Sequence, residues 1–142
     1  MVTGPRARRA DRGRALDHEA ALARADRILV TAHPAEPLGS VAVRAGEGAL
    51  ESYLEAVASG DRAPEDGAEP LRRLLARHLG ERLPDDDAGE LHAAVTAAAV
   101  VAALDVALAQ WLAEGAPSDG VAACRARFRA VAALLPPDPG SV

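Results

Sequence analysis

Apolar residues recur along most of this chain at the three- and four-residue spacing of amphipathic helices. The stripe Leu50, Tyr53, Leu54 and Val57 is the clearest example. Runs of alternating β-branched residues, which would indicate strands, do not occur. We therefore predict an all-α fold, a bundle of about five helices. The expected helices cover residues 17–33, 38–60, 70–83, 87–114 and 118–135.

Proline and glycine mark the expected helix boundaries. His33-Pro34 should close the first helix, and Asp17 is its expected N-cap. Gly46 and Gly48 each cost about 1 kcal/mol relative to alanine inside a helix. We therefore expect two short helices between residues 38 and 60, with a turn near these glycines. Ser118 is the expected cap of the last helix.

The helix expected from Asp87 to Glu114 is apolar over most of its circumference, and a shorter helix follows it to form an αα-hairpin. A helix of this kind must be covered on several sides, so we predict that two hairpins pair as a four-helix homodimer interface. Burial within a single chain is the alternative. The residues predicted at the interface are Leu91, Ala94, Val95, Ala98, Val101, Ala102, Leu108, Phe128, Val131 and Leu134.

Composition is typical of a globular protein, with 49% hydrophobic and 26% charged residues. The single Cys124 excludes an internal disulfide, and no leader segment is recognisable, so a soluble cytoplasmic protein is expected. The chain divides into four expected segments. These are a disordered basic arm (1–14), N-terminal helices (15–60), a helical regulatory and dimerisation region (61–136) and a disordered tail (137–142).

Charge is concentrated in the arm. Its five arginines and Asp11 give the first fourteen residues a charge of +4. Because the whole chain has a net charge of −5, the remaining residues carry −9. A basic arm on an acidic body suits contact with DNA phosphates. A solubilising tail is the alternative. The arginines concerned are Arg6, Arg8, Arg9, Arg12 and Arg14.

No catalytic constellation is recognisable, so we expect no enzyme activity, no metal and no cofactor. The four histidines lack metal-motif spacing, and Cys124 occupies an apolar helical position. Asp105 stands in an apolar helix, where an unpaired charge is costly; Arg125, Arg127 and Arg129 are candidate partners. A polar side of the long helix could line a pocket for a small apolar, aliphatic effector, or mark a wetted face. The tentative pocket residues are Tyr53, His92, Thr96, Asp105, Gln110 and Trp111.

The segment Leu91-His-Ala-Ala-Val-Thr-Ala-Ala-Ala-Val-Val-Ala-Ala-Leu-Asp-Val-Ala-Leu-Ala-Gln-Trp111, with the shorter helix after it, resembles the end of TetR-family regulators. It looks most like the branch related to the mycofactocin regulator, and the likeness covers roughly residues 70–135. The resemblance implies a homodimer formed by the last two helices and an effector bound among the helices. It also implies a transcriptional regulator.

The N-terminal half fits the resemblance in two ways. Residues 24–34 are similar to a regulatory-domain helix, which would leave no DNA-binding part. Alternatively, residues 6–60 resemble a shrunken DNA-binding domain, in which Val41–Gly46 opens a helix-turn-helix and Gly48–Leu54 stands for its recognition helix. That copy departs from the family pattern, because about two residues are missing after Gly46 and Glu51-Ser52 stands where Tyr-Arg is usual. A recognition helix carrying Glu47, Glu51 and Glu55 should also be repelled by phosphates. The expected function is a TetR-like regulator or a truncated relative. A structural module without ligand or DNA is the rival.

Overall fold

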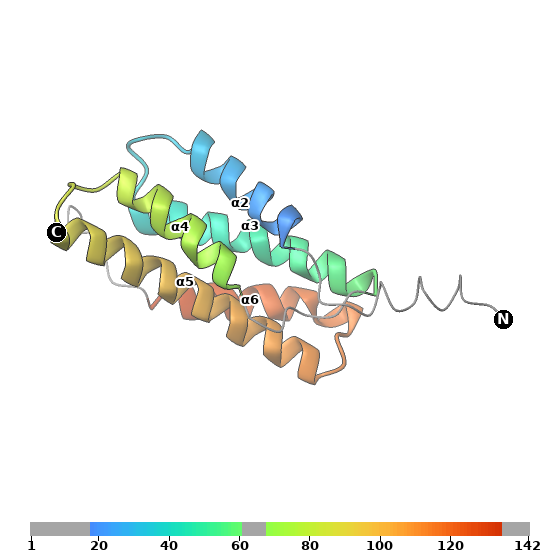
Figure 1. Ribbon diagram of the computed structural model, residues 1–142. Helices are drawn as coiled ribbons and strands as arrows, with labels where there is room; N and C mark the ends of the chain where they lie inside the picture. Colours follow the sequence, from blue (N-terminus) through green and yellow to red (C-terminus); the bar gives the residue numbers. More distant parts are fainter. Residues whose placement is uncertain (1–17, 61–67, 135–142) are drawn as a thin grey trace.

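The computed structural model describes residues 18–60 and 68–134, which form an all-α bundle without strands in those ranges (Figure 1). Five α-helices and one short 3-10 turn make up the bundle, which confirms the predicted fold class. The elements are α2 (Glu19–Thr31), α3 (Leu38–Ala58), α4 (Glu69–Glu81), α5 (Asp87–Ala113), η1 (Ser118–Gly120) and α6 (Val121–Ala132).

The helices lie side by side along one long direction, with α3 and α5 as the two long members (Figure 1). α2 packs on α3, α4 packs on α5, and α3 also contacts both α5 and α6. α6 runs back along α5 as the second arm of a helical hairpin (Figure 1). The predicted C-terminal αα-hairpin is thereby confirmed.

One hydrophobic core holds the five helices together. The largest side chains, Trp111, Tyr53 and Phe128, are all fully buried in it. Around them the core is built mostly from leucine, valine and alanine, whose small average size lets the helices approach closely.

Local sequence explains where several helices begin. The Asp86 side chain accepts a hydrogen bond from the Gly89 amide at 2.8 Å and caps α5. Pro70 occupies the first turn of α4, where its missing N–H is not needed. The predicted cap at Ser118 is wrong, because residues 118–120 form the 3-10 turn and Gly120 occupies the N-cap position of α6. Asp17, the predicted cap of the first helix, lies outside the described residues.

The turn predicted near Gly46 and Gly48 is also wrong, because α3 is one continuous helix of 21 residues. Packing explains the presence of Gly46. A Cβ there would overlap Val100 Cγ1 and lie 3.0 Å from Phe128 Cζ. Gly46 therefore allows a close approach of α3 to α5 and α6, and this contact outweighs its weak helix propensity. Residues 38–58 consequently contain no helix-turn-helix.

The turn between α5 and α6 is held by Trp111, whose indole Nε1 donates to the Pro117 carbonyl at 2.9 Å. Gly115 adopts a φ of 90°, which glycine allows without strain. α5 is long and apolar enough by composition to cross a membrane, but half of that stretch is buried inside the bundle. The core helix of a soluble protein has the same character, so this helix is only weak evidence for a membrane span.

Candidate interaction surfaces

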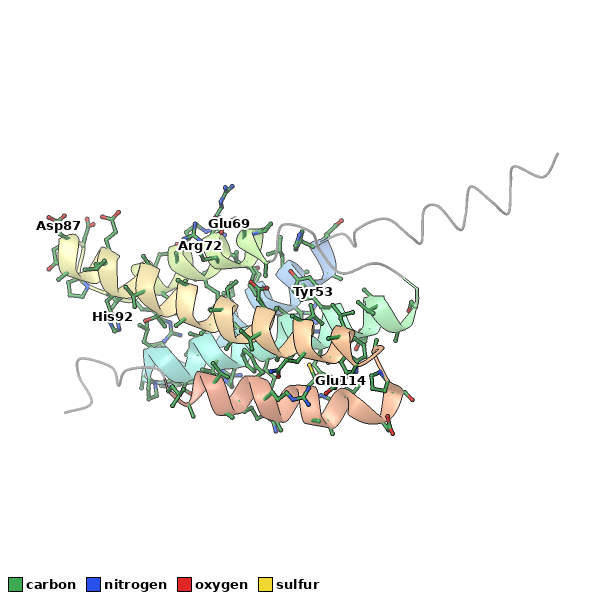
Figure 2. The ribbon with its side chains drawn as sticks, turned by 90° about the horizontal axis from the view of Figure 1, so that it is seen from below. Tyr53, Glu69, Arg72, Asp87, His92 and Glu114 are labelled. Carbon is green, nitrogen blue, oxygen red and sulfur yellow. The ribbon has the colours of Figure 1, made fainter. Side chains whose placement is uncertain are left out.

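The tentative pocket residues do not come together in the structure. Tyr53, Thr96 and Trp111 are buried in the core, whereas Gln110 is exposed. His92 lies near the start of α5, far along the bundle from Tyr53 (Figure 2). Tyr53 instead forms a hydrogen bond of 2.7 Å between its hydroxyl and His18 Nδ1. The prediction of one pocket lined by these six residues is therefore wrong.

His92 and Asp105 are the half-buried polar residues of that set. The Nε2 atom of His92 is buried without a hydrogen-bond partner in the described part of the chain. The three arginines suggested as partners of Asp105 make their ion pairs with other carboxylates. Arg125 pairs with Glu51, Arg127 with Glu114 and Arg129 with Glu47.

The predicted dimer residues divide into two groups. Val101, Leu108 and Phe128 are buried inside the single chain, with exposed fractions of 6%, 4% and 0%. The prediction is wrong for these three, because neighbouring helices of the same chain already bury them. Ala94 is half-buried. The remaining predicted residues are exposed: Leu91, Val95, Ala98, Ala102, Val131 and Leu134.

The exposed positions of α5 extend beyond the predicted set and form a continuous stripe. We call this stripe the outer face of α5. Leu91 is 64% exposed, Val95 50% and Val106 48%, and the intervening positions are exposed alanines. Sequence reasoning missed the last three members, because a helix that is apolar on nearly every side has no polar side to show which positions face outward. The outer face comprises Leu91, Val95, Ala98, Ala102, Val106, Ala109 and Ala113.

This face is unusual for an exposed helix because it carries no charge. Asp105, at its edge, is the one charged residue between Leu91 and Ala113. Of the six large hydrophobic side chains exposed in the described residues, three lie on this face: Leu91, Val95 and Val106. Contiguous apolar patches of this kind usually mark sites where a protein meets a partner.

The outward side of α3 is different, because its carboxylates are paired within the chain. Arg125 donates to both oxygens of Glu51, at 2.6 Å for the Nη2–Oε1 pair, and Arg129 pairs with Glu47. Arg125 lowers the pKa of Glu51 through this hydrogen bonding, which outweighs the effect of partial burial. Two of the three glutamates predicted to weaken a recognition helix, Glu47 and Glu51, thus link α3 to α6, and Glu55 pairs with Arg24 of α2.

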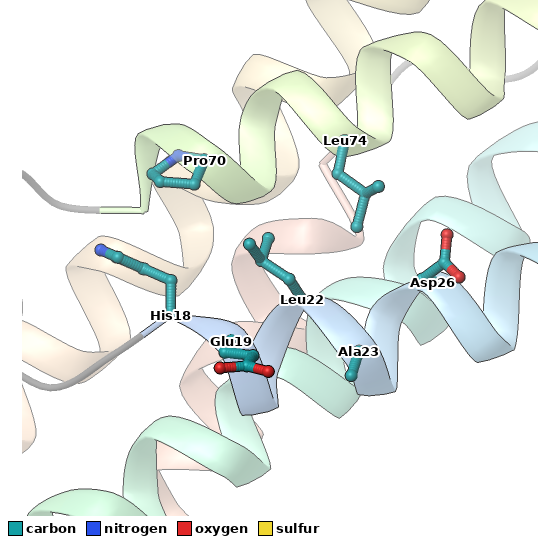
Figure 3. Close-up of a pocket in the computed structure, with 7 residues that line it drawn as sticks. All are labelled: His18, Glu19, Leu22, Ala23, Asp26, Pro70 and Leu74. Carbon is teal, nitrogen blue, oxygen red and sulfur yellow. The ribbon is translucent and has the colours of Figure 1, made fainter.

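A groove of about 580 Å³ lies between α2 and α4 (Figure 3). Leu22, Pro70 and Leu74 form its apolar part, and Ala23 lies at its edge. Two polar links flank this groove. His18 is bonded to Tyr53, and Asp26 Oδ1 lies 2.9 Å from His78 Nε2.

The described residues contain neither a cluster of metal-ligating side chains nor an exposed thiol. They contain no group of three or more histidine, cysteine, aspartate or glutamate side chains placed to hold a metal ion. The Cys124 thiol is buried and hydrogen-bonded to the Ala107 carbonyl at 3.4 Å. Burial raises the pKa of Cys124, which lowers the reactive thiolate fraction. The predicted arm, Arg6 to Arg14, lies outside the described residues.

Comparison with known proteins adds no family to these observations. No protein-family model, no curated protein and no solved structure matches the chain.

Proposed function

We propose that this protein is a dimer-forming helical module that pairs with a second copy through the outer face of α5, with α6 beside it. By its resemblance to TetR-family regulators, it would serve as the regulatory part of such a regulator or of a truncated relative. The observation that carries the proposal is the uncharged, exposed outer face from Leu91 to Ala113. Exposing that apolar surface to water is unfavourable, and a matching surface on a second copy would cover it.

Charge placement supports a protein partner over a membrane. α5 begins with Asp87 and Glu90, directly after Asp85 and Asp86, so one end of the outer face is strongly acidic. An anionic lipid surface would repel this end, since peripheral membrane helices rely on lysine and arginine.

Dilution combined with one charge substitution tests the proposal. Val95→Glu places a carboxylate within the apolar surface, where desolvating it costs about 3 kcal/mol and should raise the dimer Kd by roughly 100-fold. Val30→Glu is the matched control, because Val30 is 65% exposed on α2, away from this face. Sedimentation equilibrium over a dilution series would measure both variants. A folded monomer at every concentration would refute the proposal, as would equal effects of the two substitutions.

A small aliphatic effector is a second candidate activity, and the groove between α2 and α4 favours it. Its apolar lining with flanking histidine and aspartate side chains suits a ligand with an alkyl body and a polar end. Ala23→Trp should fill the groove, whereas Ala20→Trp, on an exposed position of α2 outside it, should not. Thermal shift with a series of straight-chain alcohols and acids would separate the two variants. No shift for the unmodified protein would refute ligand binding here.

DNA binding would then depend on the arm rather than on α3. Electrophoretic retardation with and without residues 1–14 tests this directly. Loss of retardation on deleting the arm, with no sequence preference beforehand, would indicate phosphate contact only. Sequence-specific retardation that persists without the arm would contradict the proposal.

A further inference from the structure

The seven residues of the outer face are arranged symmetrically about Ala102. Successive members are separated by four, three and four positions on each side of it. Reversing the helix about Ala102 therefore superimposes the stripe on itself. Under that reversal every larger residue meets an alanine of the other copy. The facing pairs are Leu91 with Ala113, Val95 with Ala109, Ala98 with Val106, and Ala102 with Ala102.

From this arrangement we infer that two copies pair with their α5 helices antiparallel, the two-fold axis passing at Ala102. This inference rests on the proposed dimer and adds its orientation and register. Large side chains opposite small ones keep the gap between two helices even along its length. The alanines at the centre allow the helix axes to approach to about 8 Å, the lower end of the usual range.

The parallel arrangement of the same two helices fits poorly. It would place Leu91 against Leu91 and Val95 against Val95 at one end, while alanines would face alanines at the centre. The helices would then touch at the large residues and leave unfilled space between the small ones. Such voids forfeit the contacts that hold an interface together.

Charge also selects the antiparallel arrangement. Four carboxylates lie at or just before the start of α5, on Asp85, Asp86, Asp87 and Glu90. A parallel pair would bring both acidic groups together, and like charges at that distance repel. An antiparallel pair separates them by the helix length of about 40 Å, several times the Debye length of about 8 Å. Each acidic start of α5 then lies near the end of the partner's α5, where Glu114 is already paired with Arg127.

The size of the surface suits a small interface. From Leu91 to Ala113 the outer face runs about 33 Å, and a helix about 10 Å wide presents about 330 Å² in projection over that length. The accessible area of a corrugated surface exceeds its projection, but it stays below the about 800 Å² per partner of standard interfaces, so we expect a dimer that dissociates on dilution.

Cysteine cross-linking between differently tagged variants tests the register. Val95→Cys and Ala109→Cys face each other across the inferred axis, whereas two copies of Val95→Cys lie about 21 Å apart, beyond disulfide reach. We expect the oxidised mixture to yield about tenfold or more cross-linked dimer than either variant alone. The buried Cys124 can stay in place, and the parent protein with Val30→Cys serves as the background control.

The outcomes separate the register from the proposed function. Cross-linking only in the mixture supports the inference. Cross-linking of each variant with itself would show a parallel pair and overturn it, as would a dimer by light scattering that forms no cross-link. A monomer by light scattering would overturn the dimer itself. If either variant loses its helical circular dichroism, Ala98→Cys with Val106→Cys tests the same register at an independent pair.

Discussion

α3 and α5 are the two long helices of this bundle, and their outward positions differ in kind. α3 carries Glu47, Glu51 and Glu55, each paired with an arginine of α6 or α2. α5 presents only alanine, valine and leucine along its outer face. The comparison shows that the polar side of α3 is satisfied by its own chain, whereas the described residues leave the apolar side of α5 uncovered.

The largest expected effect concerns the point where the two helices meet. Phe128→Ala should lower the free energy of unfolding by about 3–5 kcal/mol, because the fully buried ring fills the space between α3, α5 and α6. Urea denaturation would measure it, with Val131→Ala, at 38% exposure, as a milder control. A Phe128→Ala variant that weakens self-association but keeps its unfolding free energy would place the ring in an interface instead.

Two glycines of α3, Gly46 and Gly48, should respond differently to substitution by alanine. Gly46→Ala should destabilise by about 1–3 kcal/mol, since its methyl group would overlap Val100 and touch the Phe128 ring. At Gly48 the nearest atom is the end of the Ile28 side chain, which can rotate away. Gly48→Ala should therefore change stability by less than about 1 kcal/mol, helped by higher helix propensity. Thermal denaturation of both variants checks the order, and a reversed order would refute the close approach at Gly46.

The ion pairs of α3 should contribute less than its packing. A double-mutant cycle on Glu51 and Arg125, replacing each by alanine, should give a coupling energy of about 0.5–1 kcal/mol. The more exposed Glu55–Arg24 pair, with a 3.5 Å separation, is the control and should couple more weakly. Equal coupling in both pairs would show that burial at the α3–α6 contact does not matter.

The same pair predicts a pH dependence. Because Arg125 lowers the pKa of Glu51 in the folded protein, its contribution is present above the ordinary value of 4.5 and is lost as pH falls below it. The Glu51→Gln variant should therefore lose less stability between pH 5 and pH 3 than the parent protein, to a difference of about 1 kcal/mol at most. Urea unfolding at several pH values would show it. Parallel profiles for the two proteins would contradict the role of this ion pair.

The smallest effect on folding is expected on the outer face of α5. Ala102→Gln should leave the unfolding free energy of a diluted monomer within about 0.5 kcal/mol, because the side chain points to water there. At high concentration the same variant should dimerise less than the parent protein. Unfolding curves at two concentrations would test both parts. A large loss of stability at high dilution would mean that this face is covered within one chain.

Some of these features follow from the sequence and others do not. Helical periodicity predicted five helices and placed the long one at residues 87–114, against the observed Asp87–Ala113. The turn at Gly46 was predicted wrongly because local propensity cannot register a contact with Val100 and Phe128, more than fifty positions away. Ion pairs such as Glu51 with Arg125, separated by 74 residues, were unpredictable for the same reason.

By itself, the sequence determined that this protein is helical and that α5 is apolar nearly all round. It could not determine which side of α5 faces out, because a helix that is apolar on every side has no polar residues to mark the exposed face. That choice belongs to the tertiary structure. α3, α4 and α6 cover Val101, Leu108 and the rest of the inner side, and leave Leu91, Val95 and the alanine row exposed. The physical reason is that a position on α5 is buried only where another helix packs on it, and the helices that pack there come from distant parts of the chain.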